Sequence, residues 1–204
     1  KVRTGLTVFG IVIGILALVV MGSMSEYFNT NIEVAAKMVS GVIGIAPASR
    51  DVNLRLSENT IRQLERVDGV GTTIRVLSDR LSDEASSGVS FTAPETVLGV
   101  AAEHVALFFT GLKLRQGRWL ERGDQYEIIV GYKVATGHNL SLGSTLVWRK
   151  KDFTVVGIME NTNAWPDQLS IVPFEVARRE MKLAPTAIGG LYVAPASDVD
   201  GDAL

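Results

Sequence analysis

The chain opens with a long run of apolar positions that no charge interrupts. Residues 5–24 are twenty uncharged and mainly apolar residues; Lys1 and Arg3 precede them, and Glu26 is the first charge afterwards. A helix rises about 1.5 Å per residue, so twenty residues cover about 30 Å, the thickness of the hydrocarbon layer of a bilayer. We therefore expect residues 1–25 to form a transmembrane helix. The alternatives are a cleaved signal peptide, whose apolar core is usually shorter, and a helix buried in a protein core.

The residues around and inside this run indicate its orientation and one candidate packing face. Lys1 and Arg3 favour a cytoplasmic N-terminus, so the main domain is expected outside a prokaryotic cell membrane. Gly10 and Gly14 lie one turn apart, which would let a second membrane helix approach closely. The alternative is that glycine is simply common in membrane helices. Because the first residue is Lys1 rather than methionine, we expect the sequence to be part of a longer protein.

The helical pattern continues beyond the apolar run, into residues 26–41. Phe28, Ile32, Ala35 and Val39 are spaced by four, three and four residues, which is the spacing of a seam between packed helices. We therefore expect a stalk helix whose packing residues are these four. The alternative is an amphipathic helix that lies on its own domain.

The remaining pattern predicts an α+β domain with two lobes. A short strand at 41–47, a helix that starts after Ser57 and a β-rich stretch at 72–78 form one strand–helix–strand unit, and residues 169–195 repeat that order. The segment between them has short β stretches, many glycines and one helical stretch near residues 132–140. We expect three parts after the stalk: an α+β lobe at 42–88 and 150–197, an inserted mainly β lobe at 89–149, and a polar linker at 198–204.

Composition narrows the functional classes. Basic residues number 20 and acidic residues 22, with both signs scattered, so no basic surface for nucleic acid is expected. The chain has no cysteine, which excludes disulfides, thiol catalysis and cysteine-based metal sites. An outward-facing domain without disulfides must be held by its own packing.

A search for catalytic, cofactor or metal motifs yields none that is convincing. The sequence has no phosphate-binding loop of the G-x-x-x-x-G-K-[ST] type and no nucleophile elbow. His104 and His138 are the only histidines, and the acidic run at 198–202 lacks the spacing of a calcium loop. We therefore expect no catalytic residue, no metal site and no cofactor in this chain.

Aromatic residues give one candidate contact. Trp165 precedes Pro166 in a polar loop, where an exposed tryptophan would contact a partner or a membrane interface; the alternative is a ring folded back onto the domain. Phe108 and Phe109 fit either a core or an exposed contact, and packing explains Trp148.

Three stretches, in order, resemble one family. "RTGLTVFGIVIGI" at 3–15, "LRQGRWLERGDQYEIIVGYKVATGHNLSLGSTL" at 114–146 and "FTVVGIMENTNAWPDQLSIVPFEVARREM" at 153–181 are similar to motifs of ABC transporter permeases of the MacB/FtsX type, which include the lipoprotein-release permeases. The sequence departs from the family pattern at both ends. It lacks the short cytoplasmic helix that precedes this point, and it stops before the three membrane helices that follow the outer domain.

The resemblance implies a fold and a mode of action. The two lobes would be those named Porter, at 42–88 and 150–197, and Sabre, at 89–149. The permease would dimerise with a second protomer and pair with a cytoplasmic ABC ATPase that holds ATP and magnesium, and an extracytoplasmic adaptor or substrate protein would be a further partner. The membrane helix and stalk would carry motion outward for export or release of a substrate.

Two other hypotheses remain at this stage. One is a single-pass anchored binding or adaptor module that is not coupled to an ATPase; three further apolar runs downstream would exclude it. The other is a membrane-anchored hydrolase with a scattered active site, which activity-based labelling would reveal. The sequence does not select the transported substrate.

Overall fold

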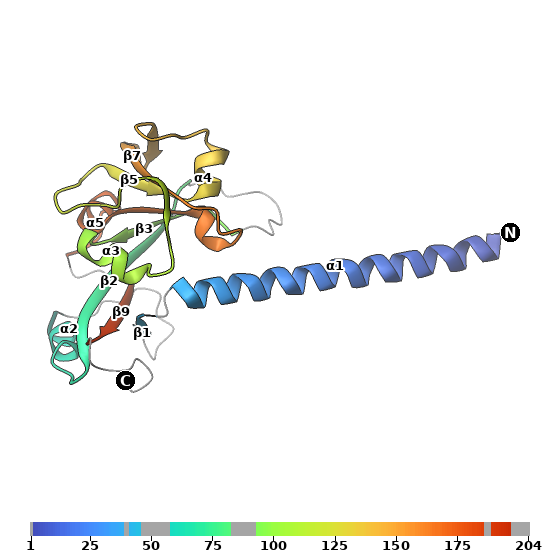
Figure 1. The fold of residues 1–204 in the computed structure, drawn as a ribbon, viewed down its shortest axis with the longest axis horizontal. Helices are drawn as coiled ribbons and strands as arrows, with labels where there is room; N and C mark the ends of the chain where they lie inside the picture. The colour runs from blue at the N-terminus through green and yellow to red at the C-terminus, as the bar shows by residue number, and fades with distance from the viewer. Residues whose placement is uncertain (1, 39–40, 46–57, 83–92, 186–188, 197–204) are drawn as a thin grey trace.

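The fold consists of one long helix and one mixed sheet covered by short helices. The computed structural model describes residues 2–38, 41–45, 58–82, 93–185 and 189–196. Helix α1 (Val2–Met38) projects from the domain as a single rod, and the other elements gather at its far end (Figure 1). The expected membrane helix and the described part of the expected stalk are thus one continuous helix.

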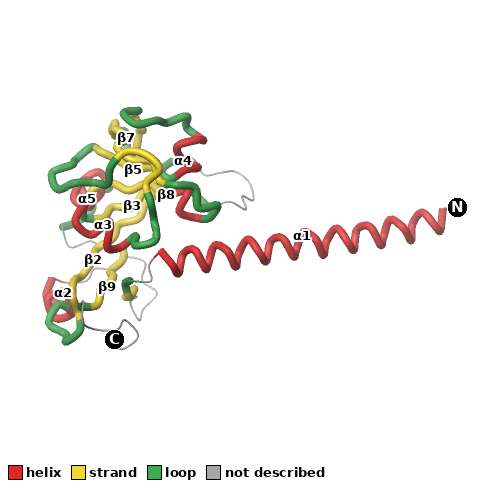
Figure 2. Tube along the Cα trace, viewed as in Figure 1, coloured by secondary structure: helices red, strands yellow, loops and turns green. Residues whose placement is uncertain are grey.

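The described part of the domain is built on one sheet of nine strands (Figure 2). Along its main path the order is β1-β9-β2-β3-β8-β5-β7-β4, and β6 pairs with β7 beside β4. The strands are β1 (Ile43–Ile45), β2 (Val70–Arg80), β3 (Thr96–Val100), β4 (Leu114–Gly117), β5 (Glu127–Val130), β6 (Thr145–Trp148), β7 (Lys151–Met159), β8 (Leu169–Pro173) and β9 (Gly190–Pro195). Two neighbouring pairs, β3 with β8 and β5 with β7, are parallel. Strand β9 lies between β1 and β2 and is antiparallel to both.

Both faces of the sheet are covered, so its central strands are buried on two sides. One face packs against α2 (Glu58–Leu64), α4 (Tyr132–Gly137) and α5 (Phe174–Glu180), in a cluster that includes Trp148 and Phe153. The other face packs against α3 (Ala102–Phe108) and the 3₁₀ helix η1 (Trp165–Gln168), in a cluster that includes Ile129 and Ile171. All five residues of β8 are buried, as expected for a strand in the middle of such a sandwich.

Most expected elements are confirmed. The strand–helix–strand order appears at β1-α2-β2 and at β8-α5-β9, and the helical stretch near residue 132 is α4. The expected N-cap Ser57 lies outside the described residues. Helix α3 was not expected, although Val105, Phe108 and Phe109 have helical spacing and are buried. These two phenylalanines therefore belong to the core and are not an exposed contact.

The sheet runs without a break across the two expected lobes. Strand β7, which was assigned to the Porter-like lobe, pairs with β4, β5 and β6, which were assigned to the Sabre-like lobe. The lobe boundaries at 88/89 and 149/150 therefore stay a prediction, and the linker at 198–204 lies outside the described residues.

An ion pair fixes the connection between β4 and β5. The Arg118 guanidinium donates to both carboxylate oxygens of Asp124, at 2.7 and 3.0 Å, and the Glu121 N–H donates to the same carboxylate at 2.9 Å. The hydrogen bonds from Arg118 are the main cause that lowers the pKa of Asp124 below its ordinary value. The charged form of Asp124 is thus favoured in the folded state.

Removing the Asp124 charge should therefore make the free energy of unfolding less dependent on pH in the acid range. A carboxylate with a lowered folded pKa contributes stability above its unfolded pKa of about 3.9, and this contribution is lost as the pH falls through the folded pKa. Because Arg118 is 41% exposed, we expect only about 1 kcal/mol. Urea unfolding at neutral and acid pH should show Asp124→Asn less stable than the parent only at neutral pH. Glu121→Gln, at an exposed carboxylate 3.8 Å from Arg118, is the control and should show no such difference.

Candidate functional site

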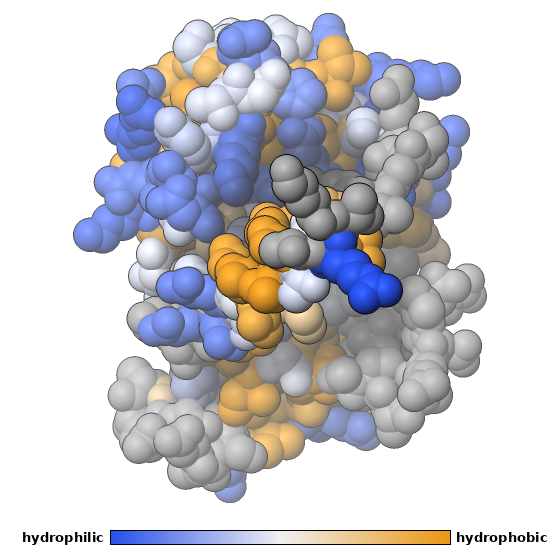
Figure 3. All heavy atoms as spheres, turned by 90° about the vertical axis from the view of Figure 1, so that its right-hand side faces the viewer, coloured by the Kyte–Doolittle hydropathy of each residue, from blue (hydrophilic) through white to orange (hydrophobic). Residues whose placement is uncertain are grey.

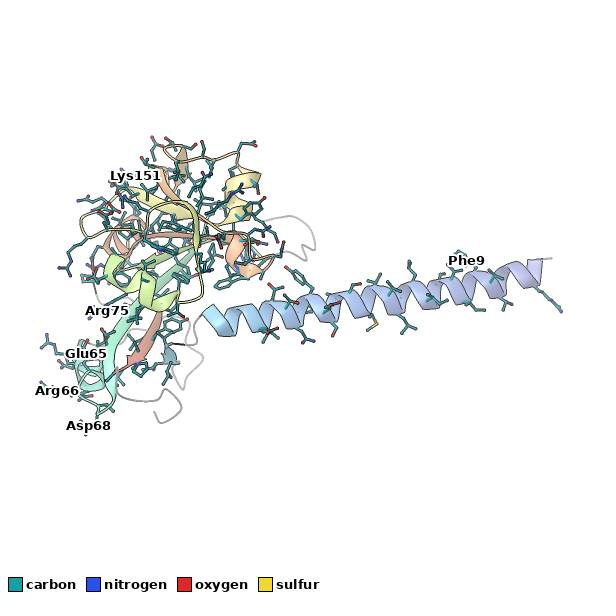
Figure 4. All side chains as sticks on the ribbon, viewed as in Figure 1. Phe9, Glu65, Arg66, Asp68, Arg75 and Lys151 are labelled. Carbon is teal, nitrogen blue, oxygen red and sulfur yellow. The ribbon has the colours of Figure 1, made fainter. Side chains whose placement is uncertain are left out.

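The candidate functional site is the contact between Asn31 of α1 and Trp165 of η1, which is called the joint. Helix α1 has 37 residues, which is about 55 Å of helix. Its segment Gly5–Glu33 is long and apolar enough to cross a membrane, and none of that apolar window is buried in the domain. A core helix would be covered by its own protein, so this finding favours a membrane span over a buried helix. Figure 4 shows Phe9, near the N-terminus of α1, standing clear of the domain.

One polar side chain of α1, that of Asn31, forms a hydrogen bond with the domain. The backbone N–H of Trp165 donates to Asn31 Oδ1 at 2.8 Å, and Asn31 Nδ2 donates to the Tyr27 carbonyl at 2.8 Å. The same amide therefore ties η1 to the backbone of α1. Among the α1 side chains whose burial is described, only that of Asn31 is half-buried; the others are exposed. Among the α1 side chains whose burial is described, the contact is thus confined to Asn31.

The loop that carries Trp165 is built around a buried carboxylate. Asp167 is fully buried, and its Oδ1 accepts hydrogen bonds from the N–H and the hydroxyl of Thr162, both at 2.8 Å. The Asp167 N–H in turn donates to the Ala164 carbonyl at 3.1 Å. Such local bonds fix the turn before η1, which therefore presents the Trp165 N–H in one orientation.

Helix α4 packs against the same loop, and this approach requires glycine. A Cβ atom at Gly131 would lie 2.4 Å from the Asp167 carbonyl oxygen, so no larger residue fits without a backbone shift. The Gly131 N–H also donates to the Leu169 carbonyl at 2.6 Å. The joint is therefore supported by α4 and β8 behind it.

The structure places Trp165 at this joint. Its side chain is partly buried and packs against the cluster on the η1 face of the sheet. The ring thus lies against the domain, while its backbone holds α1. A contact with a separate partner stays a prediction.

The predicted packing residues of α1 face outward. Phe28 is 53% and Ile32 is 67% exposed, so these residues do not lie on their own domain. A Cβ atom at Gly10 or Gly14 would have no neighbour within 4 Å. Packing of all these positions against a second helix stays a prediction. Ala35 lies in α1 and Val39 lies outside the described residues. Seen along α1, apolar residues lie at the centre of the view, and hydrophilic residues cover much of the upper left of this face (Figure 3).

The joint was not predicted from the sequence. Asn31 is an amide between Phe28 and Ile32, and a polar residue within an apolar seam was the available signal. Its partner is 134 residues away, and no local pattern could have identified that partner.

The described residues contain no cluster of metal ligands. No group of three His, Cys, Asp or Glu side chains among them is placed to hold a metal ion. His138 Nε2 lies 2.8 Å from Glu95 Oε2 in an exposed pair, and His104 lies half-buried on α3.

Comparisons with known proteins agree on one family. A family model described as the MacB-like periplasmic core domain matches residues 4–204. The chain is 29% identical over 181 residues to an uncharacterized ABC transporter permease of Methanocaldococcus jannaschii, which covers 84% of this chain and 45% of that relative. The chain thus spans less than half the length of this curated relative.

Two solved structures share the fold. The periplasmic region of MacB from Actinobacillus actinomycetemcomitans matches with a TM-score of 0.56 and 17% identity, over 85% of this chain and 81% of that one. The extracellular domain of the noncanonic ABC-type transporter YknZ from Gram-positive bacteria matches with a TM-score of 0.53 and 18% identity, over 77% of this chain and 84% of that one.

Proposed function

Because this chain belongs to the family of the MacB-like periplasmic core domain, among the ABC transporter permeases of the MacB type, we propose that α1 is a lever. The lever carries motion from a cytoplasmic ATPase to the outer sheet and thereby drives export or release of a substrate. The observation that carries this proposal is that one unbroken helix combines the apolar span with the contact to η1.

The continuity of α1 supports a mechanical role. A helix without a break moves as a rod, because packed and hydrogen-bonded elements switch between positions rather than deform continuously. Asn31 and η1 would pass a tilt or rotation of α1 to β8, which follows η1 directly in the chain. The basic residues Lys1 and Arg3 support a cytoplasmic N-terminus and an outer sheet.

The proposed partners are an ABC ATPase, a second permease protomer and an extracytoplasmic protein. The sequence has no phosphate-binding loop, so ATP and magnesium are assigned to a partner ABC ATPase. The exposed apolar residues Phe28 and Ile32, together with Gly10 and Gly14, fit a helix of a second permease protomer. An extracytoplasmic adaptor or substrate protein would contact the outer domain.

Breaking the joint should uncouple the outer domain from ATP. Asn31→Leu keeps a helix-forming residue but leaves the Trp165 N–H without its acceptor, so the link between lever and sheet is lost. Residues 1–204 contain no cysteine, so Val147→Cys, at an exposed position, adds a spin-label site to the domain without a competing thiol in this segment. In the full transporter, the label-to-label distance should change with ATP in the parent and much less in Asn31→Leu.

The matched control is Thr30→Val, next to the joint. The Thr30 hydroxyl donates only to the Glu26 carbonyl of its own helix, so this variant should behave as the parent. An unchanged ATP-dependent distance in Asn31→Leu would show that force follows another path. A parent distance that does not respond to ATP would contradict the lever itself.

A further inference from the structure

Three hollows on the surface of the described residues differ in the charged side chains that line them. A hollow of about 360 Å³ between α3 and α5 contains Glu103, Asp124 and Arg179, all of which have an opposite charge within 4 Å. A second, of about 280 Å³, contains both Glu65 and Glu175. A third, of about 460 Å³, has Arg115 as its single charged residue. This third hollow, between α4 and β4, is called the Arg115 groove.

The Arg115 groove has an apolar floor and polar sides. Ile158 of β7 and Ala135 of α4, both buried, contribute to its lining together with half-buried Leu140. Arg115 and Gln116 come from β4, whose second edge is not paired among the described strands. Its volume is in the range of small-ligand sites, which combine an apolar lining with a few polar groups.

The polar groups of the groove have unused donors. The Arg115 guanidinium carbon lies 5.7 Å from the centre of the Tyr132 ring, and no carboxylate of the described residues lies within 4 Å of that guanidinium. A contact over a ring holds the cation by its charge and consumes none of its N–H donors. The side-chain amides of Gln116 and Asn139 likewise have no hydrogen-bond partner within the described part of the chain.

These features fit an anion that is planar and carries one charge. We propose that the Arg115 groove binds a carboxylate that carries a small apolar group, either the C-terminus of a peptide or a free short-chain acid. The planar fork of arginine matches the two oxygens of a carboxylate, and the neighbouring amides supply neutral hydrogen bonds. The apolar neighbour of the carboxylate rests on Ala135 and Ile158. This proposal does not depend on the lever.

The test uses the whole chain in detergent micelles and three probes. Backbone amide spectra are recorded during titration with N-acetyl-alanyl-alanine, with its C-terminal amide, and with propionate. We expect saturable shifts at residues of β4 and α4 with the free acids and none with the amide. A much tighter complex with the peptide acid identifies a peptide C-terminus as the ligand, and similar affinities identify a short-chain acid.

Substitution of the cation provides the second arm. Arg115→Gln should weaken binding about tenfold to a hundredfold, because a hydrogen bond to a charged group contributes about 1.5–3 kcal/mol. Lys133→Met removes the same charge from an exposed position on α4 that does not line the groove, and it should bind as the parent does. Equal binding of the amide, no saturable shift with either acid, or unchanged affinity in Arg115→Gln would each overturn the proposal.

Discussion

Replacing Trp148 with alanine is expected to remove a large part of the stability of the outer domain. Trp148 is 1% exposed, lies 5.7 Å from Phe153 between ring centres, and donates its indole N–H to the Arg80 carbonyl at 3.1 Å. Deleting a buried tryptophan costs about 3–5 kcal/mol, and it also leaves the Arg80 carbonyl without this donor. The total free energy of unfolding of a native protein is only about 5–15 kcal/mol, so this single change removes a large part of it.

The measurement is the urea midpoint of the outer domain, followed by pulse proteolysis of the chain in micelles. Val147→Ala is the matched control, because Val147 is the neighbouring residue on the opposite face of β6 and is 58% exposed. It should change the free energy of unfolding by less than about 0.5 kcal/mol. If the two variants unfolded at the same urea concentration, Trp148 would not be an anchor of the sheet.

A proline in α1 should have the second large effect, on function rather than on the sheet. Glu26→Pro removes one backbone hydrogen bond and forces the ring against the carbonyl of the preceding turn, at a cost of about 3 kcal/mol or more. Position 26 lies between the apolar run and Asn31, so a kink there separates the membrane span from the joint. The proposed lever would bend, and ATP-dependent transport should fall steeply.

Spin labels at Met21 and Lys133 measure this directly, one on α1 and one on the domain. The parent should give a narrow distance distribution, and Glu26→Pro should give a shifted or broad one. Glu26→Ala is the control, because it removes the same carboxylate but favours the helix. Full transport by the proline variant, together with a broad distance distribution, would show that a stiff α1 is not needed.

Local patterns were sufficient for much of the fold. The apolar run identified α1 because its length and lack of charge are visible within one segment. The elements β8, α5 and β9 were visible for the same reason, since apolar spacing and prolines mark them locally. Helix α3 was missed because it has only seven residues, amid glycines and short β stretches that obscured its spacing.

Long-range contacts could not be obtained in this way. The pairing of β7 with β4, β5 and β6 depends on which strands share a sheet, and hydrophobic spacing does not encode partners. The hydrogen bond between Asn31 and Trp165 joins one side-chain amide and one backbone N–H that are 134 residues apart in the sequence. The Arg115 groove likewise combines a strand and a helix that are separate in sequence.

The position of β9 between β1 and β2 also sets the order in which the domain can be assembled. During synthesis, the first two strands of the sheet leave the ribosome long before the strand that joins them, so their edges wait unpaired. Closing so distant a pairing is slow, because the entropy of the long intervening chain is lost before the contacts form. We therefore expect the domain to stay prone to misfolding until β9 is inserted between β1 and β2.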